Sequence, residues 1–324
     1  METTFQEFLD KHINLTQGQI SQGSKSHQYI RNLLANRPLT DSSFPWLVDG
    51  DFLSGSYGRG TKLYPLDDID VMLVLDGAGL FPIDGGKRLD THYARGNGEN
   101  KKGPVHTHLG TDGLLSSHRV LEIFQEALNQ SHPESTISRD GQAINVHLAS
   151  YGLGIDIVPC FHIVPHDRTQ KDFYYIPQGG DSAFWLKTNP KTDAEISKNL
   201  HERHNRKLKG VIKLLKYWNR EKNADRLRSY HLETAAWYAF FNHPSAITST
   251  EEGIRYFFDN ARPYLDKQLL ELTGFGRPVD TYLTFQDRQS SLAAFDRAGS
   301  SIRSMGLLTP ASRWKAVFGD KFGN

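Results

Sequence analysis

The sequence predicts an α+β fold in which a mixed sheet, preceded by N-terminal helices, is followed by an all-α C-terminal lobe. Short apolar segments typical of strands lie before about residue 175. After that point, apolar residues recur at helical spacing almost to the end of the chain. We therefore expect one domain at 1–175 and a helical domain at 176–324. Since clefts between lobes are preferred ligand sites, we expect the active site there.

The composition is that of a soluble globular protein. The 324 residues are 38% hydrophobic and 23% charged, enough for one large or two ordinary domains. With a net charge of +1, any phosphate or nucleic-acid partner must meet a local basic patch. The single cysteine, Cys160, excludes an internal disulfide and a Cys-rich zinc site. Because neither a membrane span nor a signal-peptide pattern is found, we expect a cytoplasmic protein.

Apolar periodicity divides the first half into elements. Helices are predicted at 4–14 and 25–36, and strands at 68–76, 143–149 and 154–161. The last two strands are separated by Ser-Tyr-Gly-Leu, which predicts a hairpin. Ahead of this hairpin we expect a helix that begins after a serine cap at position 116 or 117.

The remaining segments differ in composition. Residues 77–112 are rich in Gly, Asn and Lys, which predicts a long surface insertion. Thr192 and Glu195 form a capping-box pattern, which predicts a helix that begins there and runs to about residue 222. Further helices are expected at 229–242, 251–271, 288–304 and 310–317.

Three aspartates in predicted strands point to a metal site. Asp68 and Asp70 are separated by one residue, so in a strand they share a face. Asp156 lies between Ile155 and Ile157, where a charge is costly unless something pairs with it. If the two strands are neighbours, the three carboxylates meet. Such a group suits two Mg²⁺ ions about 3.5–4 Å apart, as in phosphoryl transfer.

A glycine-rich turn lies about a dozen residues before the first of these aspartates. In "GSYGRGT", Gly55 lacks the Cβ that would keep a ligand from the backbone, and Ser56 offers a hydroxyl to phosphate oxygens. Arg59 and Lys62 add positive charge. The stretch is not a P-loop, because the GxxxxGK[ST] order is missing. A plain Gly-rich connector is the alternative, and Asp67 is interpreted as a turn residue.

These motifs together resemble a known family. "GSYGRGT", "DIDVML" and the later "IDIVP" resemble the signature of polymerase-β-type nucleotidyltransferases, and most closely that of the bacterial CD-NTases. This resemblance covers nearly the whole chain, to "WKAVFGDKFG". It implies that Asp68, Asp70 and Asp156 are catalytic metal ligands for two Mg²⁺ ions, with Mn²⁺ as a substitute. It also implies that Gly55 and Ser56 bind the nucleotide phosphates.

A stripe of cations follows the predicted helix after residue 200. Arg206, Lys209, Lys213, Lys216 and Arg220 recur at spacings of 3, 4, 3 and 4, so they share a helix face. Such a face is suited to triphosphates, although most basic stripes are simply solvated. By the family resemblance, Lys216 contacts phosphates, and Lys213, one turn earlier, is a second nucleotide-binding candidate.

The segment "RSYHLETAAW" resembles the family's Ser-Tyr pair. The resemblance implies that Ser229 touches phosphate and that Tyr230 stacks on the nucleobase, an interaction that tolerates any base. A structural interpretation of the same residues stays open, with Ser229 as the N-cap of the next helix and Tyr230 in the core.

The resemblance implies a function and its partners. CD-NTases join ATP and other NTPs into a cyclic di- or trinucleotide, which an effector protein senses in CBASS anti-phage defence. An acceptor ribose hydroxyl attacks the α-phosphate of a donor nucleotide, and pyrophosphate leaves. We expect a monomer that contacts neither membrane nor nucleic acid. Two alternatives remain, namely a transferase of the same fold that adds nucleotides to RNA, protein or a small molecule, and a catalytically silent nucleotide sensor.

Overall fold

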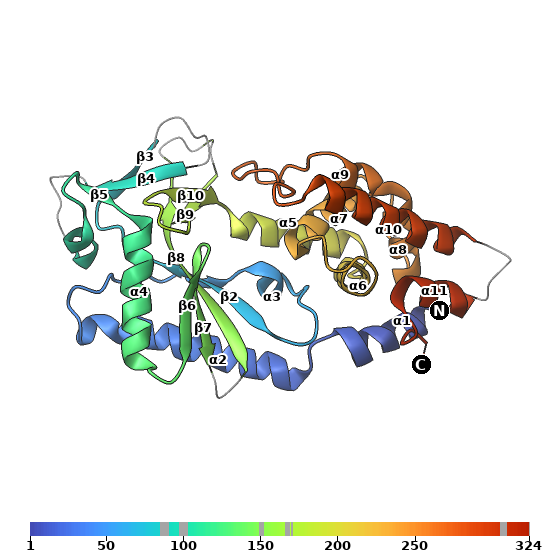
Figure 1. Ribbon diagram of the computed structural model, residues 1–324, viewed down its shortest axis with the longest axis horizontal. Coiled ribbons are helices and arrows are strands. Elements are labelled where there is room, and N and C mark those ends of the chain that lie inside the picture. The colour runs from blue at the N-terminus through green and yellow to red at the C-terminus, as the bar shows by residue number, and fades with distance from the viewer. Residues whose placement is uncertain are drawn as a thin grey trace. The chain divides into compact units, whose positions relative to one another are not determined.

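The computed structural model describes residues 1–84, 91–96, 103–148, 152–165, 169, 171–304 and 310–323. The chain forms two compact units (Figure 1). The sheet unit contains residues 17–58 and 66–190, and the helical unit contains residues 1–16, 59–65 and 191–324. The predicted domains, 1–175 and 176–324, are each one continuous stretch of the chain, whereas each of these units consists of separate stretches. The first helix and the segment 59–65 pack with the C-terminal helices.

The sheet unit is built on one mixed sheet with the strand order β1-β2-β8-β9-β10-β4-β3. Three further strands lie off this path, since β5 pairs with β4, and β7 joins β6 to β8. The strands are β1 (Phe52–Leu53), β2 (Asp68–Val74), β3 (Leu80–Asp84), β4 (Thr91–Gly96), β5 (Leu114–Leu115), β6 (Thr136–Asp140), β7 (Ala143–Leu148), β8 (Leu153–Ile163), β9 (Phe173–Pro177) and β10 (Trp185–Thr188).

Strand β8 organises this sheet because it pairs with three others. Its first part is flanked by β2, which is parallel to it, and by β7, which is antiparallel. Its last residues pair with β9. The predicted hairpin of β7 and β8 is confirmed by the pairing of Leu148 with Leu153, although turn residues 149–151 lie outside the described part. Nearly every residue of β2 and β8 is buried apart from their aspartates, as expected for strands covered on both faces.

Helices cover this sheet. Helix α2 (Gln17–Asn36) packs on β2, where a Cβ at Gly23 would lie 2.8 Å from the Ile69 side chain. Helix α4 (Ser117–Ser131) packs against β6, β7 and β9. Its predicted serine cap is confirmed, because the Ser116 side chain accepts a hydrogen bond from the Arg119 amide. The unit also contains the short helix α3 (Gly55–Arg59) and the 3₁₀ turns Arg37–Leu39 and Pro104–His108.

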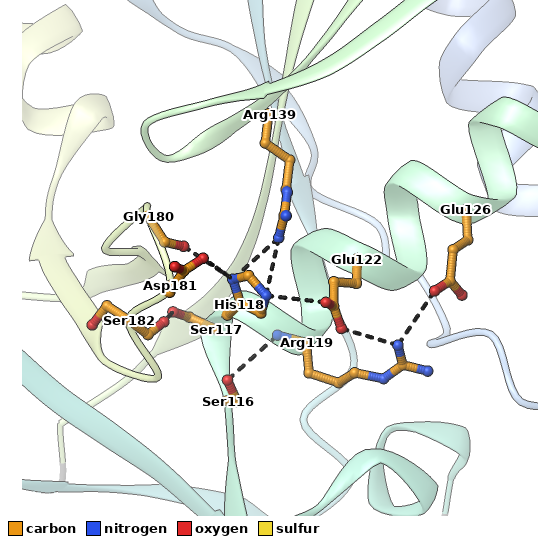
Figure 2. A network of polar contacts seen from close by, with 10 residues as sticks. All are labelled: Ser116, Ser117, His118, Arg119, Glu122, Glu126, Arg139, Gly180, Asp181 and Ser182. Carbon is orange, nitrogen blue, oxygen red and sulfur yellow. Dashed lines mark hydrogen bonds and ion pairs between the residues drawn. The ribbon is translucent and has the colours of Figure 1, made fainter.

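A polar network fixes the N-terminal end of α4 to its neighbours (Figure 2). His118 lies 3.0 Å from the Gly180 carbonyl and 3.0 Å from the Glu122 carboxylate. Arg139, from the β6–β7 hairpin, reaches the same imidazole at 3.1 Å. Ser117 donates its hydroxyl to the Ser182 carbonyl. The network therefore ties α4, the hairpin and the loop before β10 together.

The helical unit has an aromatic core. Phe5, on the first helix, packs edge-on against Trp314, Phe318 and Phe322 near the C-terminus, and Phe8 packs against the latter two. All five are buried. Its helices are α1 (Glu2–Phe8), the π-helical turn Leu9–Ile13, α5 (Pro190–Arg203), α6 (Leu208–Lys222), α7 (Ser229–Phe241), α8 (Thr250–Asn260), α9 (Arg262–Asp266), α10 (Phe285–Arg303) and α11 (Pro310–Phe318).

Three predictions about elements are wrong. The single helix expected at 251–271 is two helices, α8 and α9, which end at Asn260 and Asp266. The single helix expected from Thr192 to about residue 222 is two helices, α5 and α6, and the first already begins at Pro190. They are separated where Asn205 and Arg206 adopt left-handed backbone angles, φ 54° and 58°, which end a right-handed helix. The insertion at 77–112 is not merely a loop, because β3 and β4 within it extend the sheet. Its residues 85–90 and 97–102 lie outside the described part.

Candidate functional site

The register of two parallel strands places the three aspartates together on the sheet. Asp70 on β2 is the direct register partner of Asp156 on β8, and Asp68 pairs with Gly154. Register partners on adjacent strands point to the same face, and so do residues two apart on one strand. Asp68, Asp70 and Asp156 therefore share one face of the sheet. The expectation that the two strands are neighbours is confirmed, and the catalytic role of the aspartates stays a prediction.

Asn145 joins this face from the other side of β8. It is the register partner of Asp156 in the antiparallel β7–β8 pair, and its amide donates a 2.7 Å hydrogen bond to the Asp156 carboxylate. The sequence analysis missed this residue. The signal was available, because Asn145 lies between the buried Ile144 and Val146 just as Asp156 lies between two isoleucines. A polar residue on a strand between two apolar neighbours was informative in both places.

Gly55 is required by the carboxylate of Asp70. Its φ of +57° lies in the left-handed region that disfavours side chains. A Cβ at this position would lie 2.6 Å from Cγ of Asp70, closer than any real contact. The adjacent Ser54 amide donates to the Asp70 carbonyl at 2.9 Å, which holds the turn against β2. The space at Gly55, which the sequence predicts for a ligand, is already occupied by the Asp70 side chain.

The sheet face that carries Asp68, Asp70 and Asp156, here called the carboxylate face, has ligands of the type that hard cations prefer. Three aspartates on one face offer only oxygen ligands, which Mg²⁺ prefers. Within the described part of the chain, however, no three His, Cys, Asp or Glu side chains are grouped closely enough to hold a metal ion. Without a cation between them, the like charges of the three aspartates repel one another. To share ions, the side chains of Asp68, Asp70 and Asp156 would have to turn toward one another.

The predicted cation stripe serves three different surroundings. Arg206, exposed and just before α6, lines a pocket of the helical unit together with Lys209 and Lys213. Arg220 donates to the Tyr64 carbonyl at 3.1 Å. Lys216 is 5% exposed and belongs to a buried ion cluster. The five cations therefore do not act as one surface.

This ion cluster consists of Arg59, Lys216 and Glu233, all in the helical unit. Glu233 is fully buried and forms ion pairs with Lys216 and with Arg59, the latter at 2.8 Å. Thr61 donates its hydroxyl to the same carboxylate at 3.0 Å. Burial alone would raise the pKa of Glu233, but the two adjacent cations lower it to about 2. Lys216, the residue that the family resemblance assigns to phosphate, is held by protein groups in this structure.

The predicted Ser-Tyr pair lies at the start of α7. Ser229 is exposed and is the first helical residue, while the N-cap position belongs to Arg228, so the capping interpretation is wrong. Tyr230 is half-buried and donates its hydroxyl to Asp193 at 2.9 Å. Burial raises the pKa of Asp193 to about 6. The Arg59 guanidinium lies 5.6 Å from the Tyr230 ring centroid, close enough for a cation–π interaction.

Comparison with known proteins gives this arrangement a family. Residues 1–89 match the model of the Second Messenger Oligonucleotide or Dinucleotide Synthetase domain. A protein of Bacillus cereus described as a probable cyclic nucleotide synthase is 27% identical over 99% of this chain and 97% of its own. These two matches support the resemblance of this chain to the CD-NTases. The family prediction made from the motifs is thereby confirmed.

Solved structures support the CD-NTase fold. The CdnC of Escherichia coli, in complex with HORMA-deltaN, has a TM-score of 0.70 at 17% identity and covers 100% of this chain and 98% of its own. The di-nucleotide cyclase DncV of Vibrio cholerae, in complex with ATP and GTP, has a TM-score of 0.69 at 13% identity, with coverages of 100% and 96%. The predicted α+β nucleotidyltransferase fold is confirmed. No helix in the described part of this chain has the length and apolar character to cross a bilayer.

Proposed function

We propose that this protein is a metal-dependent nucleotidyltransferase that joins nucleoside triphosphates into a cyclic di- or trinucleotide, a second messenger in anti-phage defence. The observation that carries this proposal is the register of β2 against β8, because it aligns Asp70 with Asp156 and leaves Asp68 on the same face. A nucleotide-binding protein without turnover would have no need for three carboxylates there. A relative that is described as a probable cyclic nucleotide synthase, and that is similar along 97% of its length, supports the same activity.

The roles of individual residues follow from their chemistry. Asp68, Asp70 and Asp156 would hold two Mg²⁺ ions. When bound, these ions lower the pKa of the acceptor ribose hydroxyl and neutralise charge on the phosphates. Asn145 holds the Asp156 carboxylate in place. In the reaction, the oxygen of the acceptor ribose hydroxyl bonds to the α-phosphorus of the donor nucleotide and the hydroxyl proton is released. The bond between the α-phosphorus and the pyrophosphate leaving group breaks.

The remaining assignments are narrower. Ser56, half-buried beside Gly55, offers its hydroxyl to the donor phosphates. Ser229 is exposed and is suited to a phosphate, and Tyr230 offers a ring for stacking. We propose ATP and other NTPs as the substrates. DncV, which has a similar fold, was solved in complex with ATP and GTP. We also propose a cytoplasmic monomer whose product is read by an effector protein.

The test is a product analysis. The purified protein is incubated with all four NTPs and Mg²⁺, treated with phosphatase, and analysed by mass spectrometry. We expect a phosphatase-resistant cyclic product from the wild type and none above background from Asp156→Asn. A ladder of linear products, or a labelled RNA or protein, would instead support the alternative transferase. Nucleotide binding without turnover would indicate a sensor and contradict the proposal.

A further inference from the structure

The helical unit contains a polar pocket that lies outside the carboxylate face. Its volume is about 260 Å³, and it is lined by the first helix and its π-helical turn, the α5–α6 connection, the start of α6 and Thr250. Of the residues that the sequence assigns to the metals or the nucleotide, only Lys213 lines it. The pocket is smaller than the roughly 300–1,000 Å³ of sites for drug-sized ligands. It therefore suits a small molecule.

The lining of this pocket is strongly basic. Arg206, Lys207, Lys209 and Lys213 all contribute to it. Lys207 is neutralised by Glu2, whose carboxylate lies 2.9 Å from its ammonium and also accepts hydrogen bonds from Thr250. The other three cations form no ion pair with a carboxylate among the described residues. Lys213 donates instead to the neutral Asn14 side chain at 2.8 Å.

This arrangement is electrostatically costly without an anion. Lys209 and Lys213 are one helical turn apart on α6, and both are half-buried. Burial lowers the pKa of both lysines, and for Lys213 the neighbouring Lys216 and Lys209 lower it further. Nearby acids oppose this only in part, since Glu202 and Glu233 raise the pKa of Lys209 and Asp10 raises that of Lys213. Arg206 is held beside them by a left-handed backbone angle, a conformation that costs about 1–3 kcal/mol for a residue with a side chain. Such strain is retained where the surroundings or a function require it.

We propose that this pocket binds a small phosphate-bearing anion through Arg206, Lys209 and Lys213. A polyphosphate or a phosphate monoester has the charge to balance three cations and the oxygens to accept their hydrogen bonds. A nucleic-acid backbone is less suited, because it needs cations spread along an extended surface rather than gathered in one small pocket. The site is independent of divalent metal, since its lining supplies the positive charge itself.

The experiment is a calorimetric titration of the full chain with sodium tripolyphosphate in EDTA, so that neither metal nor turnover contributes. Lys209→Gln and Arg206→Gln should each weaken binding about tenfold, because each removes one charged hydrogen-bond donor. The matched control is Lys222→Gln, which removes the same charge from the same helix outside the pocket. It should stay within about twofold of the wild type. Circular dichroism and the melting temperature of each variant verify folding.

Three results would overturn the inference. They are an absence of tripolyphosphate binding, equal affinities for Lys209→Gln and Lys222→Gln, and binding only of a single-stranded RNA added in place of tripolyphosphate. Asp156→Asn should retain wild-type affinity, and a loss would move the anion to the carboxylate face and overturn the site as well. The titration measures binding and does not depend on product formation. Anion binding at this pocket can therefore be confirmed even if the protein makes no cyclic product, and it can be disproved even if the protein does.

Discussion

The carboxylate face of the sheet unit, whose aspartates are half-buried, and the buried ion cluster of the helical unit arrange charge in opposite ways. In the helical unit, Glu233 is enclosed by Arg59 and Lys216, so the protein itself balances the charge. In the sheet unit, the strand register brings like charges together, with Asp70 directly beside Asp156. A cluster of opposite charges can be purely structural. A cluster of like charges on one sheet face is expensive and points to a cation that is to be bound.

The comparison is tested most strongly by Asp70→Asn. If the carboxylate face holds the ions, removing one charged ligand should lower product formation by about 10⁴-fold, or about 5.5 kcal/mol of transition-state stabilisation. Stability should rise or stay equal, because a repulsion is relieved. The measurement is the rate of cyclic product formation beside the melting temperature. Asp67→Asn, one residue before β2, is the control and should retain most of the rate.

Glu233→Gln should have the second-largest effect, and on stability. The substitution leaves Arg59 and Lys216 buried without a counter-charge, which costs about 3–5 kcal/mol. Glu221→Gln, which removes an exposed partner of Arg220, should cost no more than about 0.5 kcal/mol. Urea denaturation measures both. An equal, small loss in the two variants would show that the cluster is no more important than a surface pair.

The same cluster predicts an acid limit to stability. The folded pKa of Glu233, about 2, lies below its ordinary value of 4.5. The unfolded chain therefore binds the proton more readily, and stability falls as the pH drops from about 4.5 toward 2. Glu233→Gln should lack this part of the acid dependence. A denaturation series at pH values from 5 down to 2.5 would detect the difference.

Gly55→Ala tests how closely the turn must approach the carboxylate face. The added methyl would displace the Asp70 side chain and would also occupy a left-handed backbone position. We expect about a 100-fold loss of product formation, because an approximately 1 Å misplacement of a reacting group has that effect. The matched control is Gly141→Ala, also at positive φ, +55°, but with open space around its Cβ. It should carry the backbone cost without the loss of rate.

Local pattern was enough to predict the fold and the aspartates. The alternation in "DIDVML" and "GIDIV" placed each carboxylate on a strand face, and the family resemblance supplied the pairing of the strands. Local pattern failed at the α5–α6 break, because the apolar periodicity continues on both sides of it and only Asn205, a residue that can adopt the left-handed conformation, signals the end of a helix. It also missed Asn145, whose meaning depends on its register with a strand that follows in the chain.

Long-range partners explain the remaining differences. On spacing alone, Lys216 belongs to the same helix face as Lys209 and Lys213. Its burial follows from Glu233 on another helix and from Thr61 on a distant segment, neither of which periodicity reveals. Spacing predicts which residues share a face, but only the packed structure decides whether that face meets solvent, a pocket or an opposite charge.

The smallest predicted effect comes from Asp193, a buried acid whose only hydrogen-bond donor in the described structure is the neutral hydroxyl of Tyr230. Its folded pKa of about 6 is raised above the ordinary 3.8 chiefly by burial. The folded state therefore holds the proton more tightly than the unfolded chain, and stability falls as the pH rises from about 4 to 6. Asp193→Asn keeps an acceptor for Tyr230 and removes this titration. Its stability relative to the wild type should increase by roughly 1–2 kcal/mol between pH 4 and pH 7.

The comparison of pH 4 with pH 7 isolates the effect of the Asp193 charge, because any cost of the introduced amide would be the same at both pH values. Asp296→Asn, which changes an exposed acid on α10, should give the same difference from the wild type at each pH. If the Asp193→Asn difference is also constant with pH, the buried carboxyl is ionised at no cost. Asp193 would then resemble Glu233 in being balanced by its surroundings, with Arg59 as the cation that lowers its pKa.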